Sequence, residues 1–190
     1  TLEFTVPKER KPGSAQLELV LSPSVVSALI EALPYLADYP YGCTEQTMSR
    51  FLPSVVVADT LKQLGLSLED LGRQPRSEQA KNLAEKAGVF STAGLAKRVQ
   101  ANLKRLYDFQ TASGGWGWWK EGDPSPYMTA YVVYGLLVAQ RAGYEVDASR
   151  LDHALRYLEE EYKHLTEVHL RAYVGYVLGL ADRLKPAQLE

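Results

Sequence analysis

The amino-acid sequence predicts an all-α fold built from successive helical hairpins. From Ser22 to the end of the 190 residues, apolar side chains recur at helical spacing, and glycine, proline or polar residues interrupt them. The apolar segments fall into pairs of roughly 45–55 residues, a period typical of helical-repeat proteins. Residues 1–21 differ, because their apolar and polar side chains alternate as in β-strands.

The two strands expected within residues 1–21 are too few to form a stable sheet alone. Leu2–Val6 and Ala15–Leu21 alternate in hydropathy, and the turn residues Lys11–Ser14 separate them. We therefore assign residues 1–21 to a neighbouring β-domain and residues 22–190 to the helical domain.

The first two expected helices begin at recognisable capping signals. Ser22 and Pro23 form an N-cap and a first-turn proline. The second helix is expected to begin near Thr44 and to run to Gly65, with Pro53 as a potential kink. The apolar stripes of the two helices are Val25, Val26, Leu29, Ile30, Leu33 and Leu36, and then Phe51, Val55, Leu61 and Leu64.

Four more helices are expected after a polar connection at residues 67–82. The first of them ends near Phe109, and Gly143 closes the second. Their apolar stripes are Leu95, Val99, Leu103 and Leu106; Tyr127, Tyr131, Tyr134 and Val138; Leu151, Leu155 and Leu158; and Val168, Ala172, Tyr176 and Leu180.

A connection rich in glycine and tryptophan joins the helix that ends near Phe109 to the next one. Residues 110–119 read Gln-Thr-Ala-Ser-Gly-Gly-Trp-Gly-Trp-Trp. The spacing Gln-x-x-x-Gly-x-Trp resembles that of α/α-toroid proteins such as terpene cyclases, where glycine permits a tight turn and tryptophan plugs the helix ends. The resemblance implies an α/α toroid. Since the chain is long enough for roughly three or four hairpins, we expect an incomplete, truncated toroid with an open edge.

Composition excludes several classes of function. The net charge is −2 and no cluster of five basic residues occurs, so nothing indicates nucleic acid or an anionic membrane surface as a partner. One cysteine and three scattered histidines do not supply a zinc site, and no cofactor is expected. No apolar run of 18 residues indicates a membrane span. Because the chain begins with Thr1, we expect it to be a piece of a longer protein.

The most informative segment is Cys43-Thr44-Glu45-Gln46, which contains the only cysteine. A carboxamide three residues after a thiol can condense with it, with loss of ammonia. The product is an internal thioester between the Cys43 sulfur and the Gln46 acyl carbon, in a ring of about fifteen atoms. A lone cysteine is more often a small buried apolar residue, so this spacing alone does not decide the matter.

The segment resembles the thioester motif Cys-x-Glu-Gln of the alpha-2-macroglobulin and complement family. The flanking residues Tyr-Pro-Tyr-Gly at 39–42 and Thr-x-Ser-Arg at 47–50 look most like bacterial members, as does the stretch from the tryptophan-rich connection to Val133. Thr44 stands where animal members usually have glycine. The resemblance implies that a β-sandwich domain flanks the thioester domain, and residues 1–21 are expected to belong to it.

The resemblance implies a broad-spectrum protease inhibitor with a single-use thioester, and not an enzyme that turns over. Cleavage of a bait segment elsewhere in the parent protein would trigger attack on the Gln46 acyl carbon by a lysine amine or hydroxyl of the target, leaving Cys43 free. The expected partners are target proteases, bound covalently, and the other domains of the parent. The implied location is the periplasm, either free or as a lipid-anchored protein, with a role in bacterial defence.

Four further residues are expected to support the site. Tyr41 and Gly42 form a turn that delivers Cys43 to a helix start, where free N–H groups and the positive helix end stabilise a thiolate. Glu45 is expected to be a structural cap and not a general base. Trp116 either shields the acyl group from water or packs the toroid. Other candidate shields are Tyr39, Trp118, Trp119 and Tyr127.

Some complement members use a histidine as a first nucleophile, which favours hydroxyl targets. His153, His164 and His169 stand in no matching motif and are expected to be exposed helix residues, so amine preference is expected.

Two alternatives remain open: a toroid enzyme of the terpene cyclase or glycosidase kind, and a passive helical interaction module with an inert Cys43. No aspartate-rich cluster is present, and Asp108, Glu121 and Asp123 lack a distinctive spacing for paired catalytic carboxylates.

Overall fold

The computed structural model describes residues 42–67 and 91–184, with a few isolated positions between 3 and 13. The described residues form five helices and no strand, which confirms the all-α prediction for this part of the chain. The helices are α2 (Thr44–Gln63), α5 (Thr92–Phe109), α6 (Pro126–Arg141), α7 (Ala148–Tyr162) and α8 (Val168–Leu180). Outside the described residues lie the β segment expected within residues 1–21, the helix expected from Ser22, and nearly all of the connection expected at 67–82.

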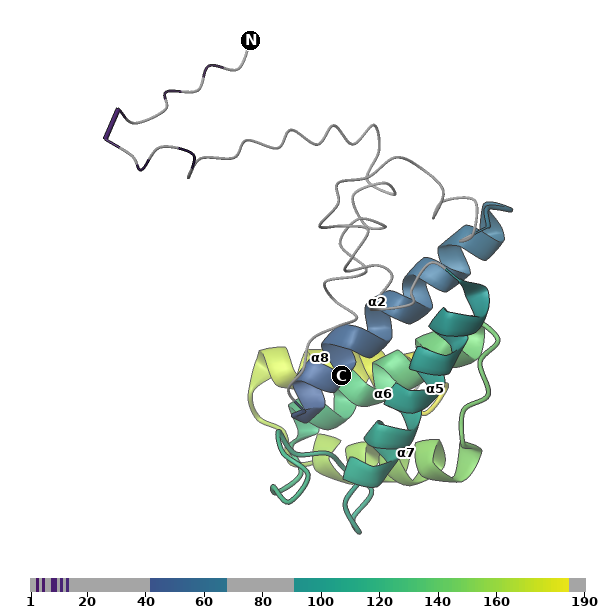
Figure 1. Ribbon diagram of the computed structural model, residues 1–190. Helices are drawn as coiled ribbons and strands as arrows, with labels where there is room; N and C mark the ends of the chain where they lie inside the picture. Colours follow the sequence, from purple (N-terminus) through teal and green to yellow (C-terminus); the bar gives the residue numbers. More distant parts are fainter. Residues whose placement is uncertain are drawn as a thin grey trace.

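The five helices form two layers. An inner layer consists of α2, α6 and α8, with α6 packed against both of the others. An outer layer consists of α5, which packs on α2, and α7, which packs on α6 and α8 (Figure 1). From α5 to α8 the chain therefore alternates between the layers, as expected of helical hairpins in an α/α toroid.

The three inner helices run parallel to one another. Along α6 and α8, Tyr127 lies beside Tyr173, with ring centroids 5.8 Å apart, and further along Tyr134 lies beside Tyr176 at 6.5 Å. The beginning of α2 is hydrogen-bonded to the Trp118 carbonyl in the loop that leads into α6. The amino ends of the inner helices thus point to one edge of the domain, which also carries the loop over residues 110–125.

The hydrophobic core lies between the two layers. The stripes expected for α5 and α7 are buried, as are Phe51, Val55 and Leu61 of α2. Leu64 was expected in the stripe of α2 but is 55% exposed, because the helix ends at Gln63. Pro53 does not break α2, which continues through it.

The apolar stripes expected for α6 and α8 face the core only in part. Tyr127, Val168, Ala172 and Tyr176 are exposed, and Tyr131, Tyr134, Val138 and Leu180 are only partly buried. The core-facing residues are instead Met128, Val132, Val133 and Leu136 of α6, and Val174, Val177 and Leu178 of α8. Both helices carry apolar residues around most of their circumference, so periodicity did not select the face that the outer layer covers.

Trp116 is the largest fully buried side chain and links the loop to α5. Its indole Nε1–H donates to the Leu106 carbonyl at 2.6 Å, and its backbone N–H donates to Thr129 Oγ1 at 2.9 Å. A buried indole with its single donor satisfied is a packing element. Two roles were expected for Trp116, shielding and packing, and its burial favours packing. The side chain lies in the core and closes the end of α5.

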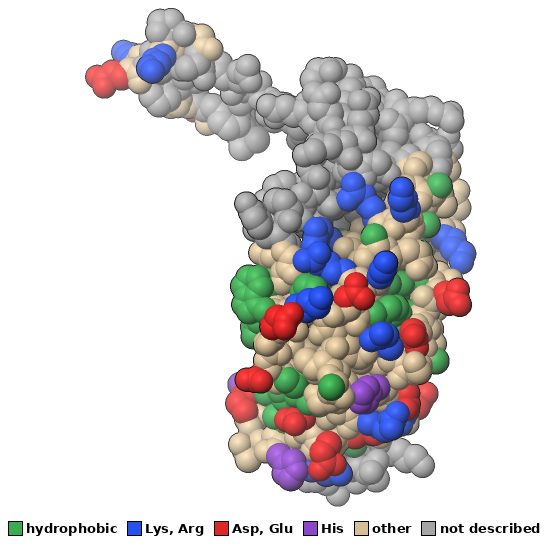
Figure 2. Space-filling model, turned by 60° about the horizontal axis from the view of Figure 1, so that its bottom comes forward, with side chains coloured by type: hydrophobic (Ala, Val, Ile, Leu, Met, Phe, Trp, Pro, Cys, Tyr) green, Lys and Arg blue, Asp and Glu red, His purple; other side chains and the backbone are tan. Residues whose placement is uncertain are grey.

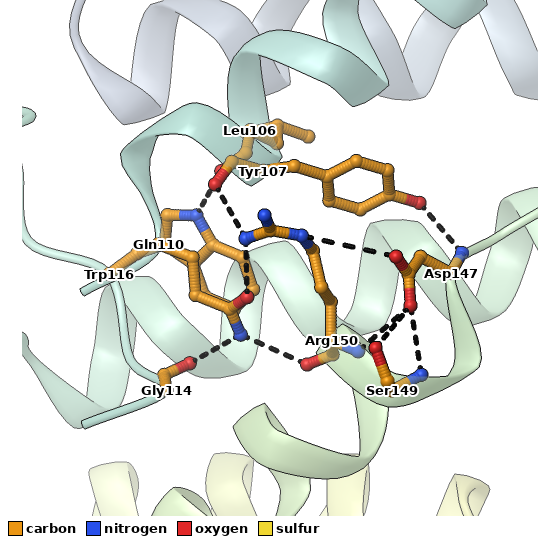
Figure 3. A network of polar contacts seen from close by, with 8 residues as sticks. All are labelled: Leu106, Tyr107, Gln110, Gly114, Trp116, Asp147, Ser149 and Arg150. Carbon is orange, nitrogen blue, oxygen red and sulfur yellow. Dashed lines mark hydrogen bonds and ion pairs between the residues drawn. The ribbon is translucent and has the colours of Figure 1, made fainter. Parts of the chain in front are cut away.

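Gln110 fixes the turn that follows α5 (Figure 3). Its side-chain Nε2 donates to the carbonyls of Gly114 and Arg150, both at 2.9 Å. The Arg150 guanidinium in turn donates to the Tyr107 carbonyl at 2.9 Å, and the Tyr107 hydroxyl accepts from the Asp147 backbone N–H. The conspicuous Gln-x-x-x-Gly-x-Trp spacing thus builds the junction between the end of α5 and the start of α7.

Replacing Trp116 by alanine is expected to lower the free energy of unfolding by about 3–5 kcal/mol, the usual cost of truncating a buried tryptophan. Trp119 is the matched control, because it is 65% exposed in the same loop, and Trp119→Ala should change stability by less than about 0.5 kcal/mol. Urea unfolding followed by circular dichroism measures both. Equal losses in the two variants would contradict the assignment of Trp116 to the core.

Candidate functional site

Cys43 and Gln46 cap the amino end of α2 reciprocally. Cys43 is the N-cap residue in extended conformation, and its Sγ accepts from the Gln46 backbone N–H at 3.4 Å. Gln46 Oε1 accepts from the Cys43 backbone N–H at 3.2 Å. This is the geometry of a capping box, in which two unsatisfied helix donors are paired. The thiol and the carboxamide are therefore held on the same turn, as their spacing in the sequence predicts.

The Cys43 thiol is free and only 7% exposed. The sequence placed Cys43 at a helix start and in none of the apolar stripes, whereas the structure buries it. Burial arises because the N-cap lies against the loop that precedes α6. A thiol in this position is sheltered from bulk water while it stays at the positive end of a helix.

Glu45 does not cap the helix, because Gln46 occupies the position that closes the capping box. The Glu45 carboxylate instead accepts from Ser49 Oγ at 2.6 Å, one turn further along α2. It faces Tyr131 of α6, whose pKa is raised first by burial and then by the Glu45 charge. As an acid in the first turn, Glu45 interacts favourably with the helix dipole.

Thr44 anchors the start of α2 to the loop before α6. Its backbone N–H donates to the Trp118 carbonyl at 2.9 Å, and its hydroxyl donates to the Gly117 carbonyl at 2.6 Å. Thr44 is 1% exposed, so both bonds are buried. A Cβ at Gly117 would lie 2.5 Å from the Asp123 carbonyl oxygen, which explains the glycine there. The sequence indicated neither contact, since Thr44 and Gly117 are 73 residues apart.

Arg105 of α5 reaches the peptide that precedes the thiol. Its Nη2 donates to the Gly42 carbonyl at 2.9 Å, and its guanidinium lies 5.0 Å from the centroid of the Phe109 ring. A Cβ at Gly42 would lie 1.8 Å from Nη2, so glycine is needed here for close approach. Tyr41, the other residue of the expected turn, and Tyr39 lie outside the described residues. No local signal in the sequence pointed to Arg105.

Positive charge gathers near the thiol. The pKa of Arg50 is lowered first by burial and then by the neighbouring guanidinium groups of Arg105 and Arg98, while Cys43 acts on it in the opposite direction. Figure 2 shows one face of the molecule, on which Lys and Arg side chains are more numerous over the upper part of the coloured surface and Asp and Glu are more widely spread.

The aromatic residues near the site lie on the surface. Trp118 is 52% exposed and stacks on Tyr127, with ring centroids 6.5 Å apart and planes 22° apart. Tyr127 also contacts Tyr173, whose pKa burial raises to about 12. Trp118 and Trp119 do not pack the toroid core, in contrast to Trp116. Both side chains are accessible for contact with another domain at the edge that carries Cys43.

The three histidines were expected to be exposed helix residues, and this is correct only for His169 of α8, because His164 lies in the connection between α7 and α8 and His153 of α7 is not exposed. His164 and His169 are exposed, and His153 is partly buried against Gly114. Within residues 42–67 and 91–184, Cys43 and Gln46 are hydrogen-bonded to each other, to Thr47 and to the helix backbone, and no histidine is hydrogen-bonded to either of them.

Three carboxylates were considered for the alternative of a toroid enzyme. All three, Asp108, Glu121 and Asp123, are exposed. A cleft of about 290 Å³ lies at the far end of α2 from Cys43, and Asp59 is the single carboxylate among its lining residues. Among the described residues there is no cluster of three metal-ligating side chains and no helix long and apolar enough to cross a bilayer.

Comparison with known proteins identifies a family model that fits most of the chain. The model is described as "A-macroglobulin TED domain" and matches residues 16–168. An alpha-2-macroglobulin of Thermotoga maritima is 35% identical over 157 residues, which cover 83% of this chain and 8% of that protein. Thioester-containing protein 1, allele R1, of Anopheles gambiae is 26% identical and covers 83% of this chain and 10% of its own length. The chain thus spans about a tenth of these relatives.

Solved structures show the same fold. Native alpha-2-macroglobulin of Escherichia coli, in a crystal structure from domain MG7 to the C-terminus, superposes with a TM-score of 0.60 at 23% identity, covering 86% of this chain and 24% of that one. Salmonella alpha-2-macroglobulin reacted with methylamine gives a TM-score of 0.59 at 22% identity, covering 84% of this chain and 10% of that one.

Replacing Thr44 by valine is expected to destabilise the domain by about 1–3 kcal/mol, because the Gly117 carbonyl would be left buried without its donor. Thr44→Ser keeps the hydroxyl and is the matched control, with a much smaller loss. Hydrogen exchange should show faster opening of the first turn of α2 in Thr44→Val only. Identical exchange in both variants would mean that the hydroxyl does not anchor the loop.

Proposed function

Because the chain belongs to the alpha-2-macroglobulin thioester-domain family of thioester-containing protease inhibitors, we propose that it carries an internal Cys43–Gln46 thioester that captures target proteases covalently. The observation that carries the proposal is the reciprocal capping of α2 by these two side chains. It places the sulfur and the carboxamide on the same helical turn, which supports a bond between them.

Thioester formation would proceed by attack of the Cys43 sulfur on Cδ of Gln46. The S–C bond forms, the bond from Cδ to Nε2 breaks, and ammonia leaves with the thiol proton. Oε1 is retained as the thioester oxygen, and in the capping box it already accepts from the Cys43 backbone N–H. A donor in that position stabilises the negative charge that collects on this oxygen during the reaction.

Capture would reverse the roles of the two side chains. An amine nitrogen of the target attacks Cδ, the C–S bond breaks, and the proton lost by the amine is returned to sulfur. The product is an amide through the former Gln46 side chain and a free Cys43. The helix amino end and the nearby guanidinium of Arg50 favour the departing sulfur anion. Each thioester reacts once, so the protein would act as an inhibitor and not as a turnover enzyme.

The family suggests how the thioester would be protected and triggered in the longer parent protein. Bait cleavage in the longer parent protein would expose the thioester to lysine amines of the bound protease, and the adjoining domains would protect it beforehand. The exposed aromatic residues Trp118 and Tyr127 lie at the edge where such a domain could exclude water.

We place the parent protein in the periplasm, where bacterial relatives of this kind would meet foreign proteases. Residues 1–21 are proposed to belong to a flanking β-sandwich domain and residues 22–190 to the thioester domain.

The freshly folded chain is expected to weigh about 17 mass units less than its sequence, the mass of one ammonia. Methylamine should release one titratable thiol and add its own mass at Gln46. Intact-mass spectrometry before and after treatment, with peptide mapping of residues 39–50, makes the measurement. A full sequence mass with a thiol that titrates before treatment would overturn the proposal of a thioester in this chain.

Cys43→Ser is expected to abolish the ammonia loss and all covalent capture, while the fold is kept because serine is a good N-cap residue. Circular dichroism and thermal melting should match the unsubstituted chain. Capture is measured in the full-length parent by the protease adduct that persists in denaturing electrophoresis. Adducts that form equally well with serine at position 43 would rule out this cysteine as half of the reactive bond.

A further inference from the structure

One peptide group connects Arg105 to the reacting atoms. The Gly42 carbonyl accepts from Arg105 Nη2 at 2.9 Å. At the other end of the same peptide, the Cys43 N–H donates to Gln46 Oε1 at 3.2 Å. A guanidinium, a peptide and the oxygen that would become the thioester oxygen therefore form a continuous hydrogen-bonded chain.

We propose that Arg105 is a positioning residue for the thioester: its guanidinium, acting through the Gly42–Cys43 peptide, strengthens and aims the N–H that binds the acyl oxygen of Gln46. This inference rests on the proposed function, because it concerns the same oxygen. It adds Arg105 of α5, which lies 59 residues after Gln46 in the sequence, to a site otherwise built from the first turn of α2.

The physical basis is polarisation of the peptide. A charge-assisted hydrogen bond to a carbonyl oxygen draws electrons toward that oxygen and makes the N–H of the same peptide a better donor. Negative charge on the acyl oxygen is greatest in the tetrahedral intermediate that precedes C–S cleavage. The stronger donor therefore stabilises the intermediate more than the resting thioester and speeds the reaction.

One contact holds the guanidinium in place, and the glycine at position 42 leaves room for it. The guanidinium lies over the Phe109 ring, one turn along its own helix, at 5.0 Å from the ring centroid. It also occupies the space that any side chain at position 42 would fill, since a Cβ there would lie 1.8 Å from Nη2. The φ angle of Gly42 lies outside the left-handed region, so alanine at this position adopts the backbone without strain from a positive φ, and the three atoms nearest to its Cβ belong to the Arg105 guanidinium.

This geometry offers two independent ways to break the connection. Arg105→Gln removes the charge, whereas Gly42→Ala keeps the charge and pushes the guanidinium from the carbonyl. Arg105→Lys is the conservative variant, because it keeps a charged donor. Lys104→Gln is the matched control, since Lys104 is the exposed neighbour on α5 and its loss changes the net charge equally.

The experiment uses the full 190-residue chain labelled with [¹³C]glutamine. Intact mass gives the thioester content, thiol release gives the rate constant of cleavage by methylamine, and isotope-edited infrared spectroscopy gives the thioester C=O stretch. We expect Arg105→Gln and Gly42→Ala each to slow cleavage by about three- to tenfold and to shift the stretch to higher wavenumber. The double variant should be no slower than either single one. Arg105→Lys should recover part of the rate, and Lys104→Gln should leave rate and stretch unchanged.

The outcomes separate this inference from the proposed function. If the unsubstituted chain carries the thioester but Arg105→Gln and Gly42→Ala both react at its rate with an unshifted stretch, the role of Arg105 is overturned and the thioester stands. If the unsubstituted chain has its full sequence mass, the proposed function fails and the role of Arg105 with it. Should Arg105→Gln fail to fold, Gly42→Ala decides, since the three atoms nearest to its added methyl all belong to the Arg105 side chain.

Discussion

The unsatisfied backbone N–H groups at the amino end of α2 are the constraint around which the site is built. Every helix must pair these donors, and most use Ser, Thr, Asp or Asn for the purpose. Here a thiol and a carboxamide pair them, so the requirement that closes the helix also brings together the two groups of the proposed thioester. The proposed chemistry and the capping share the same atoms, so a reorganised start of α2 would affect both.

The remainder of the domain keeps this helix end in place. Because the inner helices are parallel, the amino end of α2 lies at the edge that carries the loop before α6, and Thr44 binds two carbonyls of that loop. The loop is fixed in turn by Trp116, which is buried under the end of α5. Arg105 adds a contact from the outer layer. The reactive turn is thus bound to both layers, in agreement with a site that depends on preorganisation.

Local signals in the sequence were sufficient for much of the fold. Apolar periodicity indicated α2, α5, α6, α7 and α8, and the helix ends expected at Thr44, Gly65, Phe109 and Gly143 lie within two residues of the observed ones, because these signals act over one or two helical turns. The spacing of Cys43 and Gln46 predicted their contact for the same reason, since three residues along a helix start bring two side chains to one place.

What the sequence determined by itself was therefore the five helices of the described residues and the pairing of Cys43 with Gln46 at the start of α2. Only the tertiary structure decided which face of α6 and α8 is buried, since both helices are apolar on more than one face and the choice depends on the layer above them. It also decided that Trp116 enters the core while Trp118 and Trp119 stay exposed. The contacts of Thr44 with Gly117 and of Gly42 with Arg105 join positions more than 60 residues apart, and no pattern along the chain encodes them. Such contacts follow from the packing of whole helices, because that packing alone sets the distance between groups so far separated in sequence.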